Sequence, residues 1–196
     1  GNNSIAVFLK GVEGFSNGDF AFKNGAIGVN KNSVGIYAVY EDEDFEDIYL
    51  NLKMGNLRPE IYNNGYIVIG KNSTGMYLYT KYYNTKLEFS NYDRRSSIQS
   101  GEENVTGMAF NIGGDRATVE EKDTDYIIYG SNRGEIKLLG NRSTGMYLTG
   151  NGRAFIINEN KITLVNSKDK TDPGIGMYSN NPNGIIRNHN DGKIYV

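Results

Sequence analysis

The chain has 196 residues, enough for one domain with a sizeable core, and a formal net charge of -2 with a sequence pI near 5.5. This balance offers no basic face for nucleic acid or for an anionic membrane surface, and no run approaches the roughly 18 apolar residues of a membrane helix. Cysteine is absent and histidine occurs once, so His-based catalytic triads and His/Cys zinc sites are nearly excluded.

The composition is nevertheless that of a folded chain. It includes 25 Gly together with 15 Tyr, 8 Phe and regular clusters of Ile, Val, Leu and Met, which disordered chains lack. We interpret the glycines as turn residues, needed where the backbone takes a positive φ. The first residues already have the pattern of a repeat, so we expect residues 1–196 to form a single domain that is a fragment of a longer protein.

A short motif centred on glycine recurs along the chain. Its copies are Lys31–Ala38 (KNSVGIYA), Lys71–Leu78 (KNSTGMYL), Glu103–Phe110 (ENVTGMAF), Asn141–Leu148 (NRSTGMYL) and Pro173–Ser179 (PGIGMYS). The segment Asn3–Leu9 fits the same frame, with Ala6 in the glycine position. Successive glycines, from Gly35 to Gly176, are separated by 40, 32, 38 and 31 residues. Recurrence at this period indicates a solenoid.

Two further apolar runs accompany each copy. Ahead of it lies an isoleucine-centred run, with anchors at Ile27, Ile67, Ile98, Ile136, Ile162 and Ile194. After it comes a third run, at Phe20–Phe22, Ile48–Leu50, Leu87–Phe89, Tyr126–Tyr129, Phe155–Ile157 and Ile185–Ile186. Period-2 alternation is common, and no segment sustains a helical pattern over three turns.

We therefore predict an all-β fold, a right-handed parallel β-helix (β-solenoid) of about five to six coils with three short strands per coil. A sandwich or barrel is the alternative, but it would need hairpin turns at regular spacings of about 8–12 residues.

Stacked coils predict columns of equivalent residues about 4.8 Å apart. Asn32, Asn72 and Asn104 each precede a motif glycine by three residues and should form an amide ladder, which Arg142 interrupts. An inward column should comprise Val7, Ile36, Met76, Met108, Met146 and Met177. An outward, mainly aromatic column should comprise Phe8, Tyr37, Tyr77, Ala109, Tyr147 and Tyr178.

At these motifs the sequence resembles the passenger domains of large fusobacterial type V autotransporter adhesins, the RadD-like group. The resemblance rests on the repeated N-S-T-G-M-Y motif and the N-G-x-I-x-V strand before it, and it covers essentially the whole chain. It implies a right-handed β-helix on the bacterial cell surface, extracellular and tethered to the outer membrane through a C-terminal barrel not present in this chain. Such passengers mediate coaggregation or attachment to host cells.

Two groups of residues are candidates for partner binding. Tyr37, Tyr77 and Tyr147 of the aromatic column offer rigid rings with hydroxyls for sugars or protein side chains, although such a ladder can equally serve to stabilise its own sheet. The second group joins tyrosines to paired arginines, as in protein-interface hot spots, and is our preferred contact patch. Its members are Tyr82, Tyr83, Tyr92, Arg94 and Arg95.

The acidic stretch 41–47 has six carboxylates in seven residues but no glycine turn inside it. A solvated loop is the simpler interpretation, and calcium binding stays open. We predict no cofactor, no metal site and no catalytic residue. The enzyme alternative is a β-helix that degrades polysaccharides, for which Asp19, Asp115 and Asp125 are candidates, although no two of them are convincingly brought together.

The sequence thus favours a non-enzymatic adhesin segment that binds a host-cell or bacterial surface receptor, either protein or glycan, through loops and an outward aromatic face. A purely structural stalk segment is the alternative. We expect a monomer that binds no nucleic acid and does not itself insert into a membrane.

Overall fold

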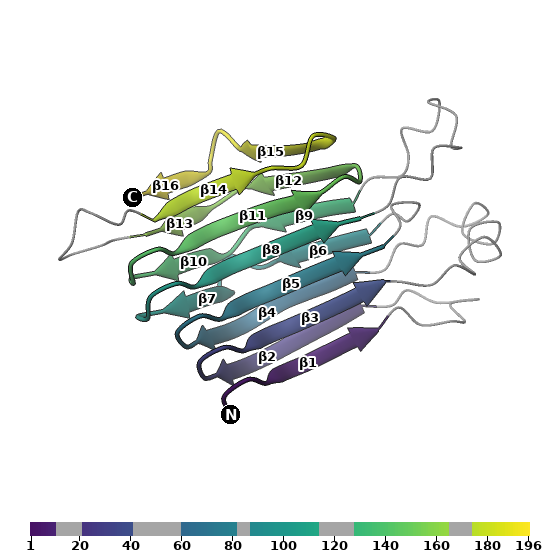
Figure 1. Cartoon of the computed structure of the whole chain (residues 1–196). Coiled ribbons are helices and arrows are strands. Elements are labelled where there is room, and N and C mark those ends of the chain that lie inside the picture. Colours follow the sequence, from purple (N-terminus) through teal and green to yellow (C-terminus); the bar gives the residue numbers. More distant parts are fainter. Residues whose placement is uncertain (11–20, 41–59, 82–86, 114–127, 165–173) are drawn as a thin grey trace.

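The chain folds into parallel β-strands arranged in two sheets (Figure 1). The computed structural model describes residues 1–10, 21–40, 60–81, 87–113, 128–164 and 174–196, and these contain no helix. The six-stranded sheet consists, in spatial order, of β1 (Ile5–Lys10), β3 (Val34–Tyr40), β5 (Thr74–Thr80), β8 (Thr106–Ile112), β11 (Thr144–Gly150) and β14 (Ile175–Ser179).

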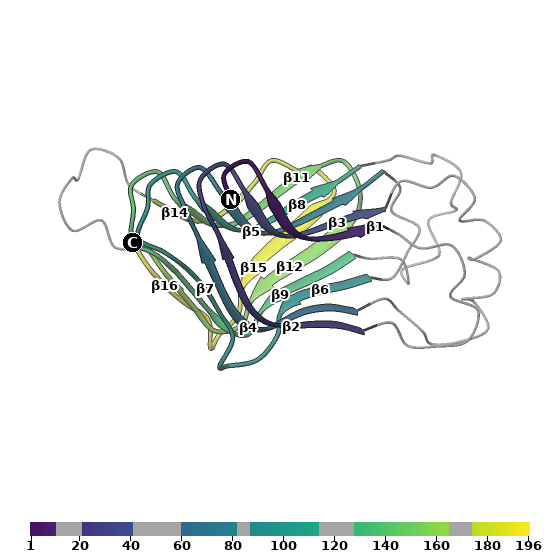
Figure 2. The same ribbon diagram turned by 90° about the horizontal axis from the view of Figure 1, so that it is seen from below.

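The ten-stranded sheet holds the strands that lie between the glycine motifs in the sequence. They are β2 (Ala21–Val29), β4 (Glu60–Ile69), β6 (Leu87–Asn91), β7 (Ser97–Ser100), β9 (Ile128–Asn132), β10 (Glu135–Leu138), β12 (Ala154–Asn158), β13 (Lys161–Thr163), β15 (Gly184–Asn188) and β16 (Lys193–Tyr195). Their spatial order is β15-β12-β9-β6-β4-β7-β10-β13-β16, with β2 paired to β4. Figure 2 shows the two halves of this sheet at an angle to each other, facing the six-stranded sheet.

Every copy of the glycine motif forms a strand of the six-stranded sheet, and equivalent residues lie beside one another. Met76 pairs with Met108, Met108 with Met146, and Met146 with Met177. Tyr37 pairs with Tyr77 in the same register. The predicted stacking of the motif is confirmed, and the described strand pairs are parallel rather than the antiparallel hairpins of a sandwich.

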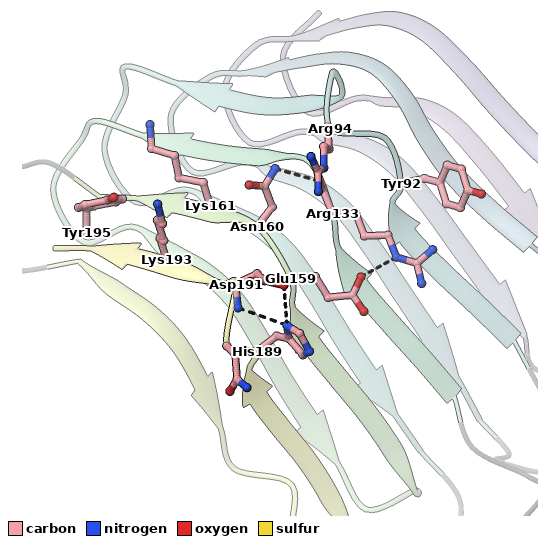
Figure 3. Close-up of a pocket in the computed structure, with 11 residues that line it drawn as sticks. Tyr92, Arg94, Arg133, Glu159, Asn160, Lys161, His189, Asp191, Lys193 and Tyr195 are labelled. Atoms are coloured by element: carbon pink, nitrogen blue, oxygen red, sulfur yellow. Dashed lines mark hydrogen bonds and ion pairs between the residues drawn. The ribbon is translucent and has the colours of Figure 1, made fainter.

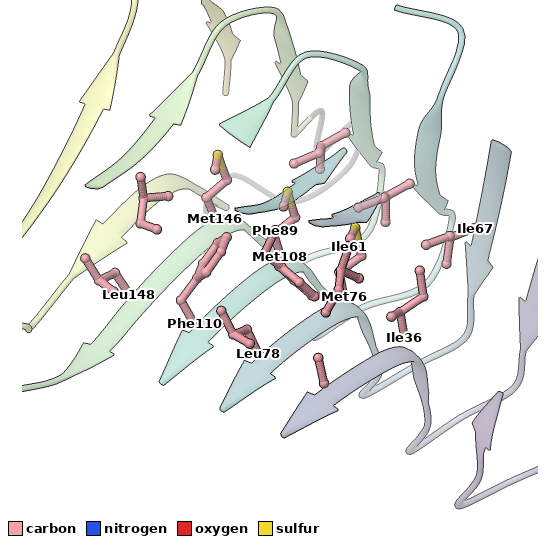
Figure 4. Packing of buried hydrophobic residues seen from close by; sticks show 14 of the residues in the cluster. Ile36, Ile61, Ile67, Met76, Leu78, Phe89, Met108, Phe110, Met146 and Leu148 are labelled. Atoms are coloured by element: carbon pink, nitrogen blue, oxygen red, sulfur yellow. The ribbon is translucent and has the colours of Figure 1, made fainter. Parts of the chain in front are cut away.

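The core lies between the two sheets and is filled by the column that we predicted to point inward (Figure 4). Ile36, Met76, Met108 and Met146 are each 0% exposed. The isoleucine column of the facing strands is in register as well, and its inner members Ile67, Ile98, Ile136 and Ile162 are also fully buried. Phe89 and Phe110 meet edge to face within this core, with ring centroids 5.6 Å apart.

One predicted strand is displaced along the sequence. The third run of the second repeat was expected at Ile48–Leu50, which lies outside the described residues. The strand that occupies this place in the sheet is the first half of β4, where Ile61 pairs with Phe22 on one side and Phe89 on the other. Apolar alternation alone did not distinguish the two segments, because both carry an isoleucine in a strand-like pattern.

The stacked glycines are required for a reason other than the one we predicted. None of the motif glycines has a positive φ. Instead, a Cβ atom on Gly75 would lie 2.5 Å from Ile98 Cγ2 and 2.7 Å from the carbonyl oxygen of Gly107. Gly35, Gly107 and Gly145 have equally close contacts with the next motif glycine and with an isoleucine of the facing sheet. The glycine column therefore allows the two sheets to approach closely at this edge.

The positive φ falls three residues earlier, at the predicted asparagine ladder. Asn32, Asn72 and Asn104 have φ values of 54°, 55° and 55°, and asparagine tolerates this conformation better than most residues. The side-chain amide of each asparagine donates to the side-chain carbonyl oxygen of the asparagine in the preceding repeat, at 3.0 Å, 3.1 Å and 2.9 Å. Asn3 is the first acceptor. Arg142 keeps the left-handed backbone, with φ 56°, where the amide ladder ends.

A second asparagine ladder, which sequence reasoning missed, is buried where the ten-stranded sheet bends. Asn63, Asn91, Asn132 and Asn158 are each 0% exposed. The side-chain amide of each of these asparagines donates to the side-chain carbonyl oxygen of the next asparagine in the ladder, and that of Asn158 donates to Asn188. Each of these hydrogen bonds is 2.7 Å long. The same amides also reach backbone carbonyls beyond the bend, as Asn132 does with Lys161 at 3.3 Å. This ladder fixes the turns on which the candidate site is built.

We predict that Gly75→Val destabilises the protein by about 3 kcal/mol or more, because its side chain would meet backbone and a buried isoleucine. Gly28→Val is the matched control, since a Cβ atom on Gly28 in β2 would have no other atom within 4 Å, and it should change stability by about 0.5 kcal/mol or less. Urea unfolding measures both. Equal midpoints for the two variants would contradict the assigned register.

We also predict that Asn132→Ala lowers the free energy of unfolding by at least about 2 kcal/mol, because it leaves the amide of Asn91 and the carbonyl of Asn158 without a ladder partner. Asn151→Ala, at an exposed turn residue, should be nearly neutral. Thermal unfolding followed by circular dichroism compares them, and a fully stable Asn132→Ala variant would show that the ladder contributes little.

Candidate functional site

The aromatic column lies on the outer face of the six-stranded sheet, as predicted. Tyr37 and Tyr77 have ring centroids 5.0 Å apart, and Tyr147 stacks on Tyr178 at 5.6 Å with an interplanar angle of 16°. Ala109 occupies the position between Tyr77 and Tyr147 and divides the column in two. The rings therefore use much of their area on one another, which is the arrangement of a stabilising ladder.

Only part of the predicted tyrosine–arginine patch lies within the described residues. Tyr82 and Tyr83 lie outside the described residues. Tyr92 follows β6 and stacks on Tyr62, with ring centroids 4.3 Å apart. In the turn after it, the backbone amide of Arg95 donates to Asp93 Oδ1 at 2.9 Å, so the aspartate shapes the turn here.

Tyr92 and Arg94 line a surface groove of about 970 Å³ on the ten-stranded sheet (Figure 3). The groove crosses the turns that follow β6, β9, β12 and β15, which are neighbouring strands. Its other lining residues are Arg133, Glu159, Asn160, Lys161, His189, Asn190, Asp191, Lys193 and Tyr195. Arg95 is not among them, and the aromatic column belongs to the other sheet. The groove thus combines two predicted residues with nine that the prediction did not include.

Arg133 is the central cation of the groove. Its Nε donates to Glu159 Oε2 at 2.6 Å, its Nη1 lies 3.7 Å from Glu88 Oε1, and its guanidinium is 5.5 Å from the centroid of the Tyr92 ring. Glu88 is nearly buried, with a side chain 6% exposed, and accepts a hydrogen bond from Ser90 Oγ at 3.2 Å. Burial alone would lower the pKa of Arg133, but the hydrogen bond and charge of Glu159 outweigh it and raise that pKa. The guanidinium is therefore held in place as a permanent cation.

Two tyrosines beside this network resist ionisation. Burial, the charge of Glu88 and a hydrogen bond to Glu60 raise the pKa of Tyr62 well above its ordinary value. Burial and the neighbouring Glu159, which accepts a hydrogen bond from the Tyr129 hydroxyl at 3.1 Å, raise the pKa of Tyr129. Both hydroxyls therefore remain neutral donors beside carboxylates.

The far end of the groove holds a second cation–aromatic contact. Lys161 Nζ lies 3.0 Å from Glu135 Oε1 and 5.8 Å from the centroid of the Tyr195 ring. Asn160 donates its side-chain amide to the carbonyl oxygen of Arg133 at 2.9 Å, which links two successive turns. The sequence does carry a signal for this site, because each of these turns follows the asparagine that ends a strand, but that asparagine was not recognised as a repeated position.

Other predicted features fall outside the described residues or show no ligand set within them. The acidic stretch 41–47 and the three aspartates Asp19, Asp115 and Asp125 are not described. In the part of the chain that is described, no group of three or more His, Cys, Asp or Glu side chains is placed to hold a metal ion. The described residues also include no helix of the length and apolarity needed to cross a membrane.

Comparison with known proteins gives no relative for this chain: no family model, curated protein or solved structure matches it. The support for a functional site therefore comes from the geometry of the groove.

We predict that the protein loses stability as the pH rises above about 10, the ordinary tyrosine pKa. A pKa raised in the folded state contributes stability that is present below the unfolded value and is lost as the pH rises, because the unfolded chain ionises first. The double variant Tyr62→Phe/Tyr129→Phe should therefore show a shallower loss of unfolding free energy between about pH 9 and 11 in urea titrations.

The control replaces the exposed Tyr66 and Tyr178, which are 59% and 46% exposed, with phenylalanine. This pair removes the same number of tyrosine hydroxyls from positions other than Tyr62 and Tyr129. An identical slope in both double variants would argue against a raised pKa at Tyr62 and Tyr129.

Proposed function

We propose that this chain is a segment of a right-handed parallel β-helix with six coils of three strands each. In this arrangement each coil contributes one strand to the six-stranded sheet and two to the bent sheet, with β2 and β4 each supplying both strands of their coil in one continuous element. The motif register and the two sheet orders support this winding. Right-handedness follows from the strong preference of parallel crossover connections for that hand.

We further propose that the segment belongs to the passenger of a bacterial surface adhesin, displayed outside the cell, that binds a receptor without chemical catalysis. The observation that carries this proposal is the groove across four stacked turns, with its tyrosines, arginines and lysines on a rigid scaffold. Aromatic and arginine side chains dominate recognition surfaces, because they offer large contact areas and directional hydrogen bonds.

A structural stalk segment is the second candidate. The observation in its favour is that the aromatic column and both asparagine ladders find their partners along the stack, as Tyr147 does with Tyr178 and Asn132 with Asn158. A surface that is self-satisfied in this way stabilises a long rod without any partner. The groove distinguishes the two candidates, because a stalk would not require it.

We predict that the fluorescently labelled chain binds saturably to cultured epithelial cells or to partner bacteria. Arg94→Ala combined with Arg95→Ala should weaken that binding at least about tenfold at unchanged melting temperature, since both side chains are exposed and arginine contacts are frequent hot spots. Lys137→Ala combined with Arg153→Ala removes the same charge from exposed positions outside the groove and should have little effect.

Flow cytometry measures both variants beside the wild-type chain. Undiminished binding by the Arg94/Arg95 variant would remove this patch as the contact surface. No saturable binding by the wild-type chain to either cell type would contradict the adhesin proposal and favour the stalk.

A further inference from the structure

The groove has a chemical character more specific than a general contact surface. Its eleven lining residues include two tyrosines, four cations and five other polar or acidic residues, and none of them is aliphatic. A peptide ligand normally anchors through apolar side chains in apolar pockets, and this groove provides no such pocket. The lining instead suits a hydrophilic ligand with flat faces that can pack on aromatic rings.

The two exposed tyrosines mark the ends of the groove. Tyr92 is 40% exposed and Tyr195 is 47% exposed, and each is already in contact with a cation, Arg133 and Lys161 respectively. The four turns between them stack at the strand spacing of about 4.8 Å, so the groove extends roughly 14 Å along the stack. Its volume of about 970 Å³ is sufficient for a short oligosaccharide.

Two of the four cations that line the groove form ion pairs with described residues, and the other two do not. Arg133 is committed to Glu159 and Glu88, and Lys161 to Glu135. Arg94 and Lys193 line the same groove, and no described residue forms an ion pair with either of them. These two cations are therefore the ones that the groove offers to a ligand that carries negative charge.

We infer that the groove binds an acidic glycan, with a sugar ring packed on Tyr195 and anionic groups of the glycan held by Arg94 at the Tyr92 end and by Lys193 at the Tyr195 end. An arginine guanidinium offers the paired donors that a carboxylate or sulfate accepts, and the lysine adds a mobile point charge. Asn160, Asn190 and Asp191 provide hydrogen-bonding groups for the sugar hydroxyls. This inference rests on the proposed binding function and names the ligand class of the same site.

Isothermal titration calorimetry on the full chain tests it with three acidic probes, namely trigalacturonate, sialyllactose and a sulfated heparin tetrasaccharide. The methyl ester of trigalacturonate and lactose are the neutral counterparts. At least one acidic probe should bind about ten times or more tightly than the neutral probes. Arg94→Gln combined with Lys193→Gln should weaken that binding at least about tenfold, while Arg153→Gln combined with Lys137→Gln, which removes two exposed charges elsewhere, should change it less than about twofold.

Three results would overturn the inference: no binding of any acidic probe at millimolar concentration, equal binding of acidic and neutral probes, or equal weakening by the two double variants. Binding of an oligoglutamate peptide as tight as that of the best glycan would also overturn it, because charge alone would then explain the site. Cell binding that persists while the glycan titrations fail leaves the adhesin proposal standing. Glycan binding without cell binding leaves the glycan inference standing and contradicts the adhesin proposal.

Discussion

The structure depends on one constraint, the parallel in-register pairing of equivalent residues in successive repeats. At a spacing of about 4.8 Å each side chain has its own counterpart as its nearest neighbour along the stack. Only residues that pack well against copies of themselves suit such positions. Methionines fill the core column, and asparagine side chains form hydrogen bonds from amide to carbonyl along two ladders. Glycines let the two sheets approach each other where Ile98 contacts the Gly75 backbone. The motif is repeated in the sequence because this pairing requires the same residue types in successive repeats.

The same constraint organises the surface. The buried asparagine ladder ties each turn of the bent sheet to the strand beyond it, as Asn132 does with the Lys161 carbonyl. The side chains that follow these asparagines are therefore presented from fixed positions in adjacent turns. They need not match one another, because they face solvent, and they vary from Arg133 to Glu159 to His189. A regular scaffold thus supports an irregular groove. Arg133 lines one side of this groove and lies close to the nearly buried Glu88.

This division of roles bears on how such a rod can recognise a partner. The aromatic column is engaged with itself, so a ligand would have to compete with existing ring contacts there. In the groove, ion pairs set the positions of Arg133 and Lys161, which lowers the entropy that binding must remove from this part of the site. The proposed recognition therefore fits the turns at the bend of the ten-stranded sheet better than the flat face of the six-stranded sheet.

The sequence by itself determined the repeat, the parallel stacking, the inward column of Met76 and Met108, the outward column of Tyr37 and Tyr77, and the exposed asparagine ladder, because all of these follow from short-range alternation and recurrence. It did not determine why Gly75 is glycine or that Asn63 and Asn132 share a buried ladder. It also did not determine that the third strand of the second repeat lies in the first half of β4. Those depend on which strands face each other across the core. The sequence carried a signal for the groove only in the asparagine that precedes each of its turns. Tertiary structure decided its lining, because the groove joins Tyr92 to Tyr195, residues far apart in the sequence that only the stacking of turns brings together.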